Sequence, residues 1–188
     1  MKLVRREWAD ARGNIRENLY ISGITKTDVK WSNIAGRLQP GEDPSTKPSH
    51  YFDLDITDPE LLSFLVSAGV NVKETPDYHN PDELNHRVRF KIYPKTSPVI
   101  RVITPSTGVV RELQYGTWGE VDALNFTEMK IEFHIFRSDF RGTHFIPSVN
   151  ILQVEADEGA GETGRAFTNE FFGYSSDDES SLDEGGFV

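Results

Sequence analysis

A regular alternation of apolar and polar side chains runs through residues 84–93. One side of an extended chain would carry Val88, Phe90 and Ile92. The other side would carry three cations and an aromatic ring, namely Arg87, Arg89, Lys91 and Tyr93. This pattern predicts a half-buried β-strand, with one side in a hydrophobic core and the other facing solvent or a ligand.

Shorter patterns of the same kind predict further strands. They lie at residues 19–24, 29–38, 51–56, 70–73, 99–104, 109–115, 129–136 and 149–154. A helix of about ten residues is predicted after Thr57 and Asp58, because Pro59 suits a first helical turn and Gly69 ends the apolar run. Residues 117–124 are predicted to form one or two helical turns.

Many short strands and a single confident helix predict a mainly β fold. The turns between strands are short and rich in proline, glycine and serine, which is typical of antiparallel neighbours. We therefore expect a small antiparallel barrel at residues 18–154, with an open sandwich as the alternative. Residues 1–17 carry many charges and few apolar residues, and we expect them to form a loosely held basic arm.

Charge is unevenly distributed along the 188 residues, whose formal net charge is −10. Residues 155–188 hold ten acidic side chains and one basic side chain, whereas residues 1–154 hold 20 acidic and 19 basic ones. Such an asymmetry marks an interaction tail. We expect a linker with glycines and aromatic residues at 155–174. A disordered acidic tail is expected at 175–188, since that segment has too few apolar residues to fold.

Several classes of protein are excluded or disfavoured. The absence of cysteine excludes disulfides, thiolate catalysis and cysteine-rich zinc sites. Neither a signal peptide nor an apolar run long enough to span a bilayer occurs. The histidines lack metal-ligand spacing, and no phosphate-binding loop or nucleophile motif is present. We therefore expect an intracellular protein that is not an enzyme, needs no cofactor or metal, and does not bind membranes.

Binding of unpaired nucleic acid requires cations spaced along a groove and aromatic faces on which bases stack. The strand at 84–93 offers both on one side, and we expect Arg89 and Tyr93 to be central. The candidate cations are Lys30, Arg37, Lys73, Arg87, Arg89, Lys91, Lys95, Arg101, Arg137 and Arg141. The candidate stacking residues are Trp31, Tyr51, Tyr93, Trp118, Phe136 and Phe140, and for each a packing role is the alternative.

Residues 54–154 resemble the single-stranded DNA-binding proteins of tailed phages. The match is carried by Leu65, the segments 69–73, 88–91, 98–104 and 121–124, and the acidic C-terminal run with Phe187. The resemblance implies an OB-fold-like barrel with a disordered acidic tail. It also implies a protein that coats unpaired DNA without strong sequence preference in phage replication, recombination or repair, in the host cytoplasm.

The tail then has an expected role. Its negative charge can imitate a polyanion and occupy the basic groove until DNA displaces it. The tail residues expected to recruit replication or recombination proteins are Asp177, Asp178, Glu179, Asp183, Glu184 and Phe187.

Two other functions remain open. One is a protein–protein adaptor or virion component with an acidic tail and no affinity for nucleic acid. The other is a metal-dependent nuclease using Asp82, Glu128 and Lys130, although this match is short. Asp53, Asp55 and Asp58 offer oxygen ligands for a divalent cation, but Asp58 is better explained as a helix cap. Homo-oligomerisation and the choice between DNA and RNA are also left open.

Overall fold

The computed structural model describes residues 1–156, except residues 10, 39, 40, 42, 44, 46, 78, 79, 81, 140 and 141. The predicted acidic tail and nearly all of the predicted linker therefore lie outside the described residues, and so do Phe140 and Arg141. β10 runs to Ala156, so residues 155 and 156 belong to a strand instead of the linker.

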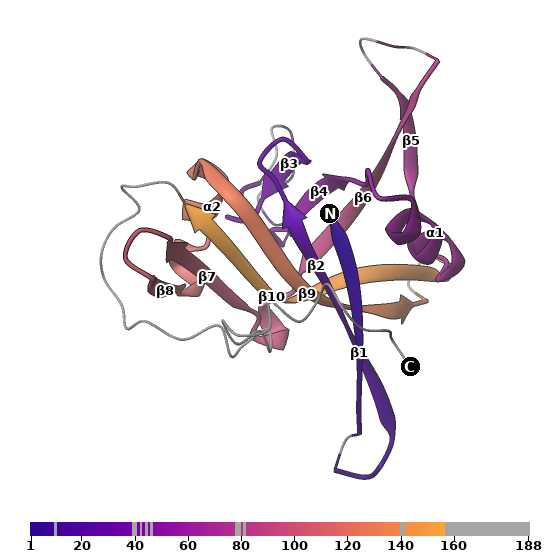
Figure 1. The fold of residues 1–188 in the computed structure, drawn as a ribbon, viewed down its shortest axis with the longest axis horizontal. Coiled ribbons are helices and arrows are strands. Elements are labelled where there is room, and N and C mark those ends of the chain that lie inside the picture. Colours follow the sequence, from indigo (N-terminus) through magenta and orange to yellow (C-terminus); the bar gives the residue numbers. More distant parts are fainter. Residues whose placement is uncertain are drawn as a thin grey trace, which may run out of the picture.

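The fold is mainly β, as predicted (Figure 1). The strands are β1 (Lys2–Ala9), β2 (Ile15–Ile24), β3 (Val29–Asn33), β4 (His50–Asp55), β5 (Lys73–Pro76), β6 (Leu84–Ile92), β7 (Val99–Thr104), β8 (Val109–Leu113), β9 (Phe126–Ser138) and β10 (His144–Ala156). The helices are α1 (Pro59–Ser67) and α2 (Glu120–Ala123), with short 3₁₀ turns at Pro94–Thr96 and Tyr115–Thr117. The helical turns expected at 117–124 are thus confirmed.

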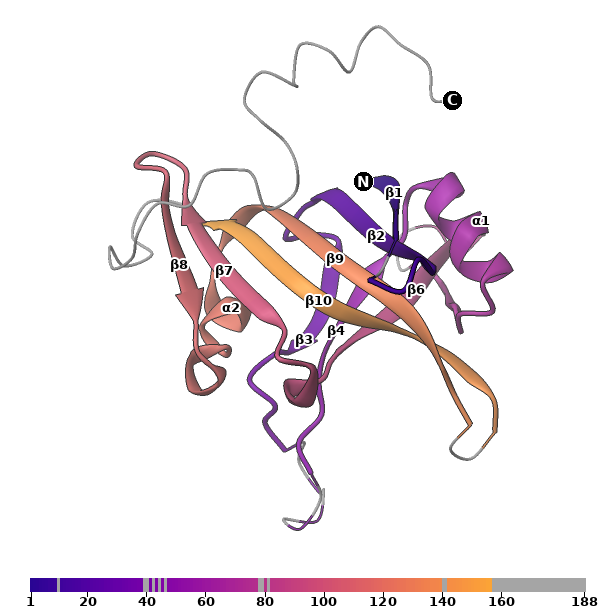
Figure 2. The ribbon, with the colours of Figure 1, turned by 90° about the horizontal axis from the view of Figure 1, so that it is seen from below.

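The strands form one sheet in the order β1-β2-β9-β10-β6-β4-β3, with β5 added to β6 and the β7–β8 hairpin added to β10. Most pairs are antiparallel, but β10 runs parallel to both β6 and β7. Within the described residues this order ends at β1 and at β3, so the sheet curves without closing into a complete barrel (Figure 2).

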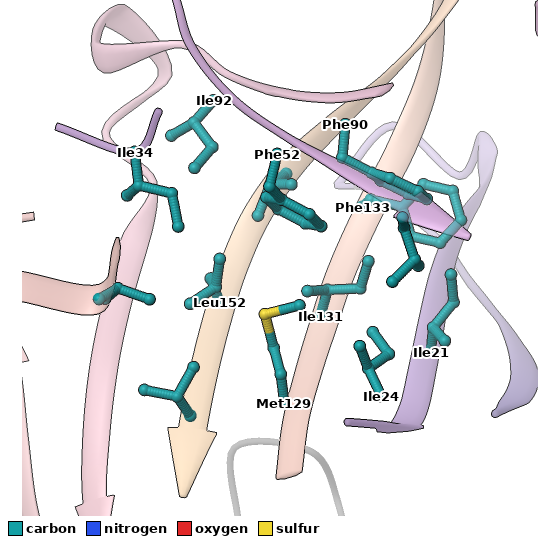
Figure 3. Close-up of a cluster of buried hydrophobic side chains, with 14 of the residues drawn as sticks. Ile21, Ile24, Ile34, Phe52, Phe90, Ile92, Met129, Ile131, Phe133 and Leu152 are labelled. Carbon is teal, nitrogen blue, oxygen red and sulfur yellow. The ribbon is translucent and has the colours of Figure 1, made fainter. Parts of the chain in front are cut away.

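One hydrophobic core lies inside the curved sheet (Figure 3). The predicted inward side of β6 is part of it, since Val88 and Phe90 are 0% exposed. The Phe90 ring stacks on the Phe52 ring with centroids 5.4 Å apart, and it meets the Phe133 ring edge-on at 5.2 Å. The period-two pattern of β6 therefore places three strands around one aromatic cluster.

Helix α1 forms where its sequence signals predict it. The Asp58 carboxylate accepts hydrogen bonds from the backbone N–H groups of Glu60 and Leu61, at 2.8 and 2.9 Å. Pro59 occupies the first turn, where a missing N–H costs nothing. Gly69 follows the helix with a φ of 76°, a left-handed conformation that glycine adopts easily. Asp58 is therefore a helix cap.

The N-terminal segment differs from the expected loose arm. β1 and the first residues of β2 pair over the full length of β1 and project as a hairpin (Figure 1). Leu3 packs against the core, but from Arg5 to Ala9 every side chain of β1 is exposed. No apolar alternation marks the part from Arg5 to Ala9, because neither of its sides enters the core. No helix of the described part is long and apolar enough to cross a membrane.

Candidate nucleic-acid interface

Two adjoining concavities follow the outer side of β6. The first, here called the Trp31 pocket, has a volume of about 580 Å³ and is lined by Trp31, Tyr51, Asp53, Asn71, Lys73, Arg87 and Arg89. The second, the Phe145 pocket, has a volume of about 420 Å³ and is lined by Val70, Asn71, Arg89, Lys91, Tyr93, Ser138, His144, Phe145, Ile146 and Pro147. Because Asn71 and Arg89 line both, the two pockets form one continuous depression, the β6 groove.

The strand order explains why these side chains meet. β4 lies next to β6 in antiparallel register, with Asp53 opposite Arg89 and Tyr51 opposite Lys91. β3 then places Trp31 opposite Asp53. Since side chains two residues apart share one side of a strand, the polar sides of β3, β4 and β6 combine into one wall.

The arginines of this wall are paired with aspartates. Arg89 donates through Nε and Nη2 to the two oxygens of Asp53, at 2.6 and 2.8 Å. Arg87 donates to Asp55 at 2.8 Å, and Lys30 lies 3.4 Å from the same carboxylate. The hydrogen bonds to Asp53 raise the pKa of Arg89 above its ordinary value. Asp53 and Asp55 are therefore engaged with cations of the protein itself.

Lys73 and Lys91 differ from the arginines, because neither has an ion-pair partner among the described residues. Lys73 lies at the end of the groove beside Trp31, and Lys91 lies in the Phe145 pocket. These two ammonium groups are therefore available to an anionic ligand such as a phosphate.

The aromatic residues of the groove are exposed to different degrees. Trp31 is 63% exposed, so the structure places it in the groove and removes the alternative of a core residue. Tyr93 is half-buried against Phe136, with ring centroids 5.5 Å apart, and this burial raises the pKa of the Tyr93 hydroxyl. The two ends of the groove thus each offer a large ring beside an unpaired lysine.

Phe145 and Asn71 also line the groove, and sequence reasoning did not select them. Phe145 is 37% exposed and lies in β10, before the segment 149–154 that the sequence predicted as a strand. Its ring packs closely over the end of α1. A Cβ atom added at Gly69 would lie 2.8 Å from Cδ2 of Phe145, closer than real Cβ contacts allow.

Two predicted site residues are corrected by their burial. Trp118 is 4% exposed and belongs to the core, where its ring lies 5.0 Å from that of Tyr115 and 5.6 Å from that of His50. It therefore cannot stack on a base. Arg101 on β7 is 6% exposed and donates to Glu112 on β8 at 3.2 Å, away from the β6 groove. Trp118 is thus part of the core, whereas Arg101 is buried on the side of β7 opposite to the core residues Ile100 and Val102, where it pairs with Glu112.

The remaining candidates surround the groove without lining it. Lys95 is exposed in the turn after β6, and Arg137 is exposed near the end of β9, where it donates to Asp139 at 2.9 Å. Lys130, part of the nuclease alternative, lies 3.4 Å from Glu128 and 3.1 Å from Glu155. Among the described residues, no group of three or more His, Asp or Glu side chains could hold a metal ion.

The site is thus a polar and aromatic groove on the outer wall of a small, mainly β domain. No family model and no curated protein matches the chain. A solved structure, the single-stranded DNA-binding protein from bacteriophage Enc34, is similar over 92% of this chain and 99% of that chain, with 13% sequence identity and a TM-score of 0.48. A likeness of this extent carries no argument about function.

Proposed function

We propose that the chain binds single-stranded DNA in the β6 groove without strong sequence preference. The observation that carries the proposal is the combination of aromatic rings and unpaired lysines along one depression. The exposed Trp31 lies with Lys73 in the Trp31 pocket, and the half-buried Tyr93 lies with Lys91 in the Phe145 pocket. Cations that follow a backbone and rings that stack on successive bases are the two requirements for such binding.

The groove also accounts for a lack of sequence preference. Base edges are read by fixed hydrogen-bonding groups, whereas stacking rings accept every base because each has a π-face. Within the described part of the groove, Arg87 and Arg89 donate to Asp55 and Asp53, so the protein itself fixes the orientation of these side chains. We therefore propose a coating protein that protects unpaired DNA in phage replication or recombination.

The acidic tail belongs to the same proposal, on the basis of the charge asymmetry of the sequence alone. Residues 175–188 would compete with DNA for the groove and, when displaced, offer Phe187 to a replication or recombination protein. The division into a binding domain, a linker at 155–174 and a tail is proposed with it. Deleting residues 175–188 is expected to raise DNA affinity at low salt, and an unchanged or lower affinity would contradict the competition.

The decisive experiment is a titration of the full chain with oligo-dT while tryptophan fluorescence is recorded. We expect quenching of Trp31, binding weaker for duplex DNA than for the single strand, and an affinity that falls steeply with salt because phosphate contacts release counterions. Trp31→Phe should remove most of the quenching, whereas polarisation of a labelled oligonucleotide should still report binding. An adaptor would show no binding at any salt concentration, with or without residues 175–188, and a nuclease would cut the strand in the presence of magnesium or manganese.

A further inference from the structure

Among the described cations that line the β6 groove, Arg89 alone is held from two directions, by contacts of its guanidinium group with Asp53 and Tyr51. Its guanidinium edge donates to both oxygens of Asp53, whose side chain is only 9% exposed. One of its planar faces lies over the Tyr51 ring, with the guanidinium carbon 3.8 Å from the ring centroid. A bidentate hydrogen-bonded pair and a ring contact together fix the orientation of the plane.

The position of Arg89 leaves its second face open to a ligand. Its side chain is 49% exposed although two of its nitrogens are hydrogen-bonded, and it lines both the Trp31 pocket and the Phe145 pocket. Tyr51 and Arg89 thus form a two-layer stack in the middle of the groove, between Trp31 on one side and Tyr93 on the other.

A phosphate is a poor ligand for this guanidinium. Asp53 already supplies the carboxylate that a bidentate arginine prefers, and its negative charge would repel a phosphate placed beside it. The flat, weakly hydrated face of a guanidinium, in contrast, stacks well on nucleic-acid bases. Lys73 and Lys91 carry no such acidic partner among the described residues and suit phosphates better.

We propose that Arg89 binds a base by stacking and does not contact a phosphate. Arg89 is then a central element of the stacking surface, and Lys73 and Lys91 neutralise the phosphate backbone. The inference rests on the proposed single-stranded DNA binding and specifies how that site works. Asp53 and Tyr51 are then positioning residues, because they hold the guanidinium plane in the orientation that a base requires.

The test compares an oligo-dT with an abasic strand of the same length, using the full chain and Arg89→Lys. The variant keeps the charge and removes the planar group. On oligo-dT it should bind about tenfold more weakly, in line with the loss of one stacking contact. On the abasic strand its affinity should match that of the unaltered chain, and the dependence of affinity on salt should be unchanged.

Lys91→Ala is the matched comparison within the same groove. It should weaken binding to both strands, and its salt slope should be shallower by about 0.7 for the phosphate contact that is lost. If Arg89→Lys weakened binding to both strands equally, Arg89 would be a phosphate contact and the inference would be overturned. An unchanged affinity of Arg89→Lys for oligo-dT would overturn it as well.

A second variant is needed because Arg89→Lys weakens the pair with Asp53 and could prevent folding. Tyr51→Leu keeps the Arg89–Asp53 pair and removes only the ring beneath it. It should weaken binding to oligo-dT by a smaller factor and leave binding to the abasic strand unchanged, whereas equal losses on both would contradict the stack. If the unaltered chain bound neither strand, the proposed function itself would fail and the inference with it.

Discussion

The two sides of β6 are built from the same strand but are held in place in different ways. Val88 and Phe90 on the inner side are fully buried and are fixed by packing alone. Arg87 and Arg89 on the outer side are fixed by aspartates of the neighbouring strand β4. The inner side therefore provides stability, and the outer side provides a surface whose cations are oriented before any ligand arrives. Substitutions on the two sides should accordingly affect different measurements.

The largest effect is expected on the inner side, from Phe90→Ala. The substitution removes a ring that contacts the rings of Phe52 and Phe133 and leaves a cavity among three strands. Such changes lower the free energy of unfolding by about 3–5 kcal/mol. Urea denaturation measures this quantity. Val66→Ala, at a position on α1 that is 57% exposed, is the control and should change it by less than about 0.5 kcal/mol.

The next effect is expected on the outer side, from Trp31→Ala. Because Trp31 is 63% exposed, its loss should leave the unfolding transition nearly unchanged. Loss of a stacking ring should weaken the binding of oligo-dT by about 1–3 kcal/mol. Fluorescence polarisation measures the affinity. Trp8→Ala removes a tryptophan that is 48% exposed on the β1–β2 hairpin, outside the groove, and an equal loss of affinity in that variant would contradict the assignment of the site.

A smaller change should follow from Lys73→Ala, which removes an exposed cation without an ion-pair partner in the described structure. The slope of the logarithm of affinity against the logarithm of salt concentration should decrease by about 0.7 if one phosphate contact is lost. Lys2→Ala makes the same charge change on β1 and should leave the slope unaltered. Equal slopes for both variants would place the backbone of the DNA away from Lys73.

The smallest effect concerns pH. Burial raises the pKa of Tyr93, so the unfolded chain releases this proton at a lower pH than the folded chain. Below a pH of about 10 both states are protonated and Tyr93 contributes no pH dependence; above it, the stability of the folded chain falls as pH rises. Urea denaturation at neutral and alkaline pH should show a smaller alkaline loss for Tyr93→Phe than for the unaltered chain. If both chains lost the same stability at alkaline pH, the effect would come from other groups, such as Tyr20, whose pKa is also raised by burial.

Elements with strong local signals could be predicted from the sequence. The alternation in β6 and the cap, proline and glycine of α1 each depend on residues close together in the chain. Strand β1, and with it the β1–β2 hairpin, could not be predicted, because the side chains from Arg5 to Ala9 are exposed on both sides of the strand. β1 is stabilised by pairing with β2, and such backbone pairing leaves no pattern of apolar residues in the sequence.

The central residues of the candidate site could be predicted from the sequence, but the ion pairs that they form could not. Arg87, Arg89 and Lys91 do share one side of β6, and Tyr93, which directly follows the strand, lines the same groove. Arg87 and Arg89 are neutralised by Asp55 and Asp53 because β4 lies next to β6. The paired residues are more than thirty positions apart in the chain, so the sequence contains no local sign of the pairing. Trp118 was misassigned for the same reason, since its ring packs against His50, which is distant in the sequence. Arg101 was misassigned because its burial depends on how the β7–β8 hairpin pairs it with Glu112.

The close approach of Gly69 to Phe145 limits the substitutions that this chain can accept in evolution. A methyl group at position 69 would meet the ring of Phe145, and the left-handed φ of 76° would strain any side chain there even beside a smaller residue 145. Homologous chains should therefore keep glycine at this position whichever residue occupies position 145. A retained glycine directly after α1 would mark the wall of the groove in relatives whose overall sequences have diverged.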